Sequence, residues 1–200
     1  MKIKNLVYLL AVFLLILACK KDKDDAEDNF DAAGQALIDD QVLVEYLKTH
    51  YLNAGNNAIE MILDGETALM DRVITQTVVR NEISYKLYVL NDSFPGVTFA
   101  PATVDSVLVT YSGMTLDEVV FDSRDSRTWI SLIDVIPGWS FGFTNFKGGN
   151  VVVRADESFY YEDFGKGFLF IPSGLAYRNF AQGVIPENSP LIFEITLRDT

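Results

Sequence analysis

Four short segments in the C-terminal half of the chain each place an aromatic or branched aliphatic residue beside a proline, glycine or serine. They read FDS at 121–123, VIPGW at 135–139, IPSGLAY at 171–177, and VIP at 184–186 running into LIF at 191–193. None of them supplies a nucleophile, a metal cluster or a phosphate-binding loop. If the fold brings them together, they form an apolar aromatic pocket with a few polar atoms at its edge. Such a pocket suits an apolar ligand of defined shape, such as proline.

The size and the net charge of the chain limit the classes of protein to which it can belong. With 200 residues, of which 49% are hydrophobic, the chain can form one domain with a substantial core and additional elements. Its net charge of −12 argues against nucleic acid as a partner, because phosphate binding requires a cationic face. A single His and a single Cys provide no metal-spaced set and no internal disulfide. We therefore expect neither a metal nor a cofactor.

The N-terminus has the pattern of a targeting segment. Lys2 and Lys4 precede an apolar run at 6–17, which is shorter than the roughly 20 residues of a membrane-spanning helix. The run ends just before Cys19, and this junction resembles a bacterial lipobox. The resemblance implies a signal peptide over 1–18, lipid on Cys19, and anchorage to the bacterial outer membrane at its periplasmic face or at the cell surface. An ordinary signal peptide with an incidental cysteine is the alternative.

A charged segment over residues 19–31 follows this leader. It mixes lysines with aspartates and has little to bury, which is typical of a flexible tether. Lysine followed by acidic residues directly after a lipidated cysteine also resembles the surface-export signal of Bacteroidetes lipoproteins. A solvated spacer explains the same residues, so both interpretations stand.

Residues 32–82 are interpreted as an N-terminal helix and an extension. The helix is predicted over 32–51, where Leu37 and Leu47 fall near one apolar stripe and Asp39 lies mostly elsewhere. Asp31 can cap its start.

The remaining pattern predicts strands and one further helix. A hairpin is predicted from residues 73–79 and 83–90. Further strands are predicted at 104–111, with a break at Ser112 and Gly113, and at 119–121, 167–171 and 191–197. A short helix begins at Pro137, carries Trp139, Phe143 and Phe146, and ends at Gly148 and Gly149. The pattern predicts an α+β fold, an antiparallel sheet with one short helix packed on it.

The motifs occur in an order that resembles the FK506-binding-protein (FKBP) family. The segments are VTYSGM at 109–114, FDS at 121–123, VIPGW at 135–139, IPS at 171–173, LAY at 175–177, VIPEN at 184–188 and the closing LIFEITL at 191–197. The resemblance extends over residues 83–200. It implies a twisted antiparallel sheet wrapped around a short helix, and peptidyl-prolyl cis–trans isomerase activity on proline-containing polypeptides.

The resemblance also implies roles for individual residues. Trp139 resembles the floor of the family's pocket, and Tyr177 resembles the hydroxyl donor. Tyr111, Phe121 and Phe193 resemble aromatic walls, Asp122 the carboxylate at the pocket edge, Val135 and Ile136 the rim, and Ile185 the flap contact. Trp129 is the candidate for a further family aromatic that has no clear match. The implied catalytic residues are Tyr111, Phe121, Asp122 and Tyr177, and the implied substrate-binding residues are Val135, Ile136, Trp139, Ile185, Phe193 and Trp129.

The chain departs from the family pattern in three places. The segment between Asp122 and Val135 is short, with Arg127 as a possible partner of Asp122. Arg178 replaces a glycine. Residues 150–164 resemble an insertion, and together with the lipobox and the leading helix this resembles lipoprotein members from Bacteroidetes. We expect an extra hairpin there, which either packs separately or reshapes the substrate groove.

Three functions remain open at this point, of which glycan binding through aromatic residues such as Tyr160 and Tyr161 has no specific motif. Isomerisation of an X-Pro amide breaks no bond and needs no nucleophile, base or metal, so an apolar pocket with a few donors suffices. A folding helper anchored by lipid is therefore the first hypothesis. The alternative is a catalytically weak or inactive FKBP-like binding module at the cell surface. The sequence leaves the oligomeric state open.

Overall fold

The structure is a computed structural model that describes residues 30–92 and 99–200. Residues 31–200 form one compact unit. The predicted signal peptide, the predicted lipidation site at Cys19 and nearly all of the predicted tether lie outside the described residues.

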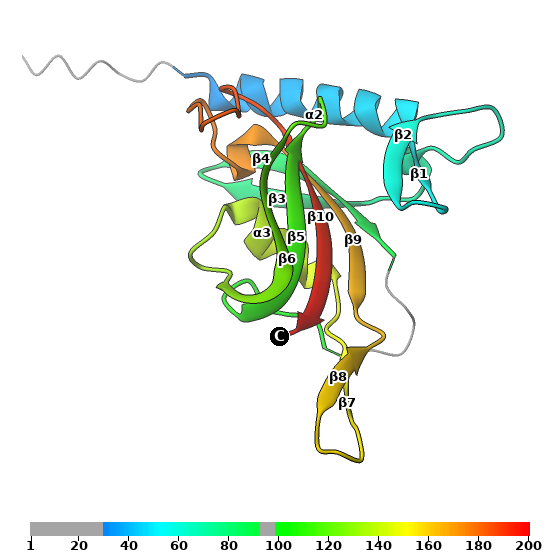
Figure 1. Ribbon diagram of the computed structural model, residues 1–200. Coiled ribbons are helices and arrows are strands. Elements are labelled where there is room, and N and C mark those ends of the chain that lie inside the picture. Colours follow the sequence, from blue (N-terminus) through cyan, green and yellow to red (C-terminus); the bar gives the residue numbers. More distant parts are fainter. Residues whose placement is uncertain (1–29, 93–98) are drawn as a thin grey trace, which may run out of the picture. The chain divides into compact units, whose positions relative to one another are not determined.

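Six antiparallel strands form the central sheet in the order β3-β4-β9-β10-β5-β6 (Figure 1). Their bounds are β3 Ile74–Arg80, β4 Ile83–Asn91, β5 Ser106–Thr115, β6 Val120–Ser131, β9 Gly165–Ile171 and β10 Leu191–Asp199. The closing strand β10 lies between β9 and β5, so that Phe193 pairs with Leu169 on one side and with Gly113 on the other. With the helices packed on it, this sheet confirms the predicted α+β fold.

The predicted hairpin is formed by β3 and β4. Asn81 and Glu82 at its tip both have positive φ, 48° and 64°, as a tight two-residue turn between twisted strands requires. The boundary expected between residues 82 and 83 falls in this turn. Because β4 also pairs with β9, β3 belongs to the same sheet as the C-terminal strands.

Strand β5 continues through Ser112 and Gly113, where we expected an interruption. Gly113 is buried, and a Cβ atom at this position would lie 2.6 Å from Cε1 of Phe193 and 2.8 Å from Cζ of Phe121. The glycine therefore marks a close approach of two rings to the backbone, as glycine inside a strand often does.

One face of the sheet packs against helix α3, Pro137–Gly142, and the 3₁₀ turn η3, Phe143–Asn145. The helix starts at the predicted proline and ends at Gly142, well before the expected stop at Gly148. Large buried side chains on this face include Trp139, Phe143, Phe146, Leu169, Phe193 and Ile195.

The opposite face packs against the N-terminal helix α2, Ala32–Thr49, which crosses the sheet above β4 (Figure 1). The Asp31 carboxylate accepts a hydrogen bond from the backbone N–H of Gly34 at 2.8 Å, which confirms the predicted N-cap. The predicted stripe was wrong at its N-terminal end, because Leu37 is 67% exposed while Asp39 is buried. The core on this face includes Leu43, Tyr46, Leu47, Tyr88, Phe168, Phe170 and Ile192.

Two small ribbons and two short turns complete the fold. Strands β1 His50–Asn53 and β2 Ala58–Met61 pair beyond α2, and the 3₁₀ turn η2, Leu69–Asp71, follows them. Strands β7 Asn150–Val153 and β8 Phe159–Glu162 form the expected hairpin in the insertion. The 3₁₀ turn η4, Ser173–Leu175, follows β9.

Candidate functional site

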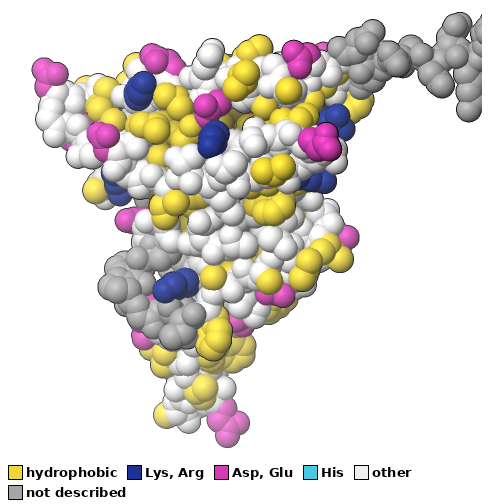
Figure 2. Space-filling view, turned by 180° about the vertical axis from the view of Figure 1, so that it is seen from behind, with side chains coloured by type: hydrophobic (Ala, Val, Ile, Leu, Met, Phe, Trp, Pro, Cys, Tyr) yellow, Lys and Arg dark blue, Asp and Glu magenta, His cyan; other side chains and the backbone are white. Residues whose placement is uncertain are grey.

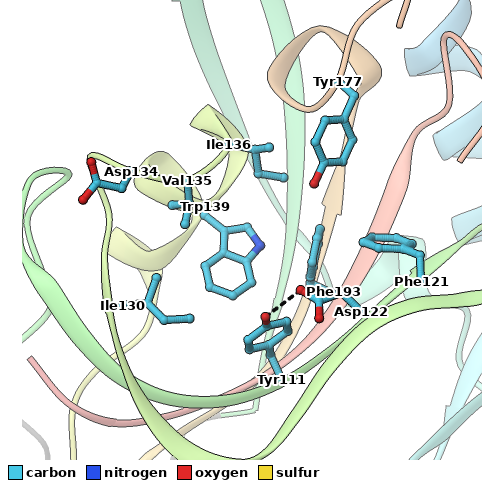
Figure 3. A pocket seen from close by; sticks show the side chains of 10 residues that line it. All are labelled: Tyr111, Phe121, Asp122, Ile130, Asp134, Val135, Ile136, Trp139, Tyr177 and Phe193. Carbon is cyan, nitrogen blue, oxygen red and sulfur yellow. Dashed lines mark hydrogen bonds between the residues drawn. The ribbon is translucent and has the colours of Figure 1, made fainter. Parts of the chain in front are cut away.

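A pocket of about 390 Å³ opens between α3 and the sheet. The side chains that line it come from β5, β6, the start of α3, the segment after η4, and β10 (Figure 3). They are Tyr111, Phe121, Asp122, Ile130, Asp134, Val135, Ile136, Trp139, Tyr177 and Phe193. The volume lies in the range of small-ligand pockets.

Trp139 forms the floor of this pocket. Pro137 occupies the first helical position of α3, where its fixed φ and missing N–H cost nothing, and this start places Trp139 inside the fold at 3% exposure. Tyr111 and Phe193 pack edge-on against the indole, with ring centroids at 4.9 and 5.2 Å. The indole Nε1 is buried and has no hydrogen-bond partner among the described residues. The floor is therefore rigid and apolar, with one unpaired donor.

The aromatic walls are arranged around Phe193. Phe121 meets its ring edge-on at a centroid distance of 5.5 Å, and Tyr111 lies at 6.5 Å. Edge-to-face packing of this kind favours one arrangement of the rings. Phe193 is 4% exposed, while Tyr111 and Phe121 are half-buried. The walls thus present ring surface to a ligand.

A hydrogen bond between two strands fixes the polar edge of the pocket. The Tyr111 hydroxyl donates to Oδ2 of Asp122 at 2.7 Å (Figure 3). Burial, followed by this hydrogen bond, raises the pKa of Tyr111 to about 12. The phenol therefore remains protonated at neutral pH and keeps its hydroxyl directed at Asp122.

Tyr177 extends over the mouth of the pocket and directs its hydroxyl inward (Figure 3). Burial, with the nearby Asp122 charge as the smaller cause, raises the pKa of Tyr177. Within residues 30–92 and 99–200 its hydroxyl makes no hydrogen bond, and the backbone N–H of Ile136 likewise has no acceptor. These two donors are available to a ligand carbonyl.

The structure brings together eight of the ten residues that the family resemblance implied as catalytic or substrate-binding. Trp129 and Ile185 do not line the pocket. Trp129 is 55% exposed and pairs with Leu108, whereas its neighbour Ile130 pairs with Val107 of the buried core. Since adjacent strand residues point to opposite faces, Ile130 occupies the wall in place of Trp129.

Ile185 packs in the core below the expected flap. It is 3% exposed, and it exchanges backbone hydrogen bonds of 2.9 Å with Gln182. These bonds turn the segment so that the isoleucine faces inward. Val184, at 61% exposure, points outward instead.

The sequence reasoning missed Ile130 and Asp134. Ile130 alternates with Trp129 along β6, and its pairing with the buried Val107 decides that Ile130 faces the pocket. The Asp134 carboxylate points away from the rings (Figure 3). Arg127 does not pair with Asp122; its guanidinium lies 6.0 Å from the centroid of the Tyr161 ring.

The hairpin of the insertion leaves the pocket open. None of its described residues lines the pocket, and it projects away from the sheet (Figure 1). It bears exposed apolar side chains, Val151, Val153 and Phe159, and acidic side chains at its tip (Figure 2).

Metal-binding clusters and membrane-spanning helices are both absent from the described part of the chain. Residues 30–92 and 99–200 contain no group of three or more His, Cys, Asp or Glu side chains arranged to hold a metal ion. None of the helices in the same ranges is long and apolar enough to span a membrane.

A six-stranded antiparallel sheet that packs around a short helix, with an aromatic pocket between them, defines a protein of FKBP-like fold. The model of the family described as FKBP-type peptidyl-prolyl cis-trans isomerase matches residues 98–198, half of the chain. The chain therefore belongs to the FKBP-type peptidyl-prolyl cis-trans isomerase family, as its motifs predicted.

Curated relatives agree with this assignment. The isomerase FkpA of Escherichia coli K12 is 36% identical over 103 residues, which are 50% of this chain and 33% of that protein. FkpA of Buchnera aphidicola is 32% identical over 146 residues, 72% of this chain and 53% of that protein. The matches thus span about a third to a half of the length of these relatives.

Two crystal structures share the fold. An isomerase from Pseudomonas syringae pv. tomato superposes with a TM-score of 0.50 at 23% identity, over 83% of this chain and 93% of that one. FkpA from Escherichia coli also gives a TM-score of 0.50 at 23% identity, over 100% of this chain and 73% of that one.

Proposed function

We propose that this chain isomerises X-Pro peptide bonds of polypeptides bound in the aromatic pocket. The observation that carries the proposal is the aromatic floor and walls together with two donors at the mouth, the Tyr177 hydroxyl and the Ile136 N–H, which have no acceptor among the described residues. Membership of the FKBP-type isomerase family supports the same activity.

The geometry suits this reaction because the barrier is amide resonance, roughly 18–20 kcal/mol. A planar amide has a polar carbonyl that water solvates, and a twisted amide has less resonance and a less polar carbonyl. Moving the proline ring from water onto Trp139 therefore disfavours the planar form more than the twisted one. Catalysis requires this difference, because only interactions stronger in the transition state accelerate the step.

The donors hold the flanking peptide while the amide turns. The Ile136 N–H is fixed at the N-cap of α3, and the Tyr177 hydroxyl reaches in from the segment after η4 (Figure 3). When a substrate carbonyl accepts a hydrogen bond from one of these two donors, that part of the peptide is held in place. The part on the other side of the X-Pro bond is then free to rotate. No group on the protein has to gain or lose a proton.

A proline-peptide isomerisation assay on the full-length chain in mild detergent tests the proposal. The wild type should relax an X-Pro peptide well ahead of the uncatalysed tens to hundreds of seconds. Tyr177→Phe should lose about tenfold in kcat/KM, the factor for one hydrogen bond in the transition state. Tyr160→Phe in the projecting hairpin is the matched control and should retain the wild-type rate.

A folded wild type without activity above background would sink this proposal. The alternative binding module then becomes testable with the same samples. A titration of the indole fluorescence with a proline peptide would report binding at Trp139 without turnover, with Trp129→Phe used to remove the second indole.

We further propose that lipid on Cys19 anchors this activity to the outer membrane as a helper of protein folding. The proposal rests on the apolar run before the only cysteine and on the charged segment after it. Metabolic labelling with a radioactive fatty acid in a bacterial host should label the wild type. Label that persists in Cys19→Ser would contradict lipidation at this residue.

A further inference from the structure

A buried carboxylate on the N-terminal helix lies outside everything that the family match covers. Asp39 of α2 is 1% exposed, more deeply buried than any other carboxylate in residues 30–92 and 99–200. A carboxylate at this depth needs hydrogen-bond partners, because burial of an unpaired charge is costly. Its partners therefore indicate why a charge is retained there.

Both oxygens of Asp39 are occupied. Oδ2 accepts two hydrogen bonds of 2.7 Å from Ser173, one from the backbone N–H and one from the Oγ hydroxyl. Oδ1 accepts a 2.8 Å bond from Nε2 of Gln35, one turn earlier in the same helix. Two of the three bonds thus reach across from α2 to the turn η4.

Ser173 passes this contact on to the residue that covers the pocket. Its carbonyl accepts the backbone N–H of Ala176 at 2.9 Å and that of Arg178 at 2.8 Å. These are the two neighbours of Tyr177 in the chain. One serine therefore links the Asp39 carboxylate to both sides of the Tyr177 backbone.

The side of the η4 turn that faces β4 is tightly packed. A Cβ at Gly174 would overlap Cε1 of the Tyr85 ring, so the turn packs directly against β4. The backbone of Arg178 takes a positive φ of 59°, and its carbonyl accepts the N–H of Asn188 at 2.8 Å. Asp39 holds this turn from the side of α2 through its two hydrogen bonds from Ser173.

We propose that Asp39 is a positioning residue for the isomerase reaction, which holds the Ser173–Tyr177 turn so that the Tyr177 hydroxyl points into the pocket. The N-terminal helix is then a functional part of the site. This inference rests on the proposed function. The competing explanation is that Asp39 only ties α2 to the sheet and contributes stability.

A double-mutant cycle on the full-length chain separates these explanations. Asp39→Ala should lower kcat by about tenfold with little change in KM, as Tyr177→Phe does, because both remove the same transition-state hydrogen bond. The double variant should be no slower than either single variant, since residues that act through one contact are not additive. Losses that multiply in the double variant would overturn the proposal.

Two further variants control for folding and for charge. Asp40→Ala removes the neighbouring carboxylate, which accepts a 2.6 Å hydrogen bond from the Tyr88 hydroxyl of β4 and makes no hydrogen bond to Ser173, Gly174 or Leu175. It should destabilise the fold yet leave kcat unchanged for the folded protein. Asp39→Asn keeps an acceptor oxygen for Ser173 and should retain kcat within about twofold. Equal kcat losses in Asp39→Ala and Asp40→Ala would contradict the proposal.

A spectroscopic measurement reports the position of Tyr177 independently of activity. If the wild type is inactive, the proposed isomerase function fails, but the effect of Asp39 on Tyr177 can still be tested. In protein labelled with 3-fluorotyrosine, the Tyr177 ¹⁹F signal is identified by its loss in Tyr177→Phe. Asp39→Ala should shift or broaden this signal, while Asp39→Asn and Asp40→Ala leave it in place. An unmoved Tyr177 signal in Asp39→Ala would overturn the proposal without any activity measurement.

Discussion

A helix covers each face of the six-stranded sheet, but the pocket of four clustered aromatic rings, Tyr111, Phe121, Trp139 and Phe193, lies on the α3 face. Alternate residues of β10 point to different faces: Phe193 belongs to the core below α3, and Ile192 to the core below α2. On the α3 side, Tyr111 and Phe121 remain half-buried around an opening. On the α2 side, Leu43 and Leu47 are fully buried.

This difference separates binding from stability. An aromatic ring that is only partly covered by its own chain has surface left for a ligand, whereas a fully buried leucine contributes only to the fold. Figure 3 shows the open face, with Tyr177 as its one contribution from the segment after η4. The hydrogen bonds from Asp39 to Ser173 join the two faces.

We expect the largest loss of stability from a cavity in the core below α2. Leu47→Ala should lower the free energy of unfolding by about 2–5 kcal/mol, because a fully buried leucine loses its contacts and leaves a void. Denaturant unfolding measures this loss. The isomerase rate per folded molecule should stay near that of the wild type, since Leu47 lies about two turns beyond Asp39 in the helix.

Leu37→Ala is the matched control in the same helix. Leu37 is 67% exposed, so its removal should change the free energy of unfolding by less than about 0.5 kcal/mol. Equal losses in the two variants would mean that α2 does not pack on the sheet as described.

The open face should respond to a single added methyl group. In Gly113→Ala the new Cβ meets the rings of Phe193 and Phe121 at 2.6 and 2.8 Å, so both walls must move. We expect kcat/KM to fall about tenfold or more, because small displacements of a positioned site are costly. Overpacking should also lower the free energy of unfolding by about 1–3 kcal/mol.

Gly148→Ala provides the control for this substitution. Its Cβ would make an ordinary contact with Cγ2 of Thr200 at 3.4 Å, so rate and stability should both be retained. If Gly113→Ala kept the wild-type rate, Phe121 and Phe193 would not form the functional walls of the pocket.

A smaller effect should appear in the pH dependence of stability at Asp39. Burial raises the pKa of Asp39 above its ordinary value of 3.8, and the hydrogen bonds from Ser173 and Gln35 reduce this rise only in part. With a raised folded-state pKa, the stability that the protonated form adds is fully present below pH 3.8. It is lost as the pH rises through the folded pKa.

Asp39→Asn cannot titrate and has no such loss. The free energy of unfolding of Asp39→Asn should therefore rise relative to that of the wild type as the pH increases from about 3.8. Urea unfolding at a series of pH values measures the difference. Asp31→Asn removes a carboxylate from the exposed start of the same helix, where asparagine caps equally well. A difference between Asp39→Asn and wild type that stays constant with pH would contradict the raised pKa.

Local patterns in the sequence predicted most of the elements and most of the pocket. Eight of the residues that the ordered motifs predicted line one pocket. These motifs were recognisable because each combines a turn with a buried side chain. Trp129 does not line the pocket because its neighbour Ile130 pairs with the buried Val107. Three residues of β6, 125–127, lie opposite the single Thr110, and these two extra residues keep the alternation of faces. The face of each residue follows from its pairing with β5, which no local pattern reveals.

The rotation of α2 about its own axis was also beyond the sequence. Hydrophobicity favoured burial of Leu37 and exposure of Asp39, and the structure has the reverse. The deciding contact joins Asp39 to Ser173, 134 positions away in the chain. A small residue on the same helix, Ala36, is buried at 7% exposure and belongs to the α3-side core.

The projecting hairpin belongs to neither face, and its removal should have the smallest effect. Asn150 pairs with Glu162 at its base, so residues 151–161 can be replaced by an Asn-Gly turn. The replacement removes the 3.0 Å hydrogen bond from the Tyr161 hydroxyl to Asp199, worth about 1 kcal/mol. KM and kcat for a short proline peptide should stay within about twofold, because no hairpin residue lines the pocket. A change in KM for the short peptide would show that the hairpin does reach the substrate groove. A change in KM that is seen only with an unfolded protein substrate would assign Val151, Val153 and Phe159 to contacts beyond the pocket.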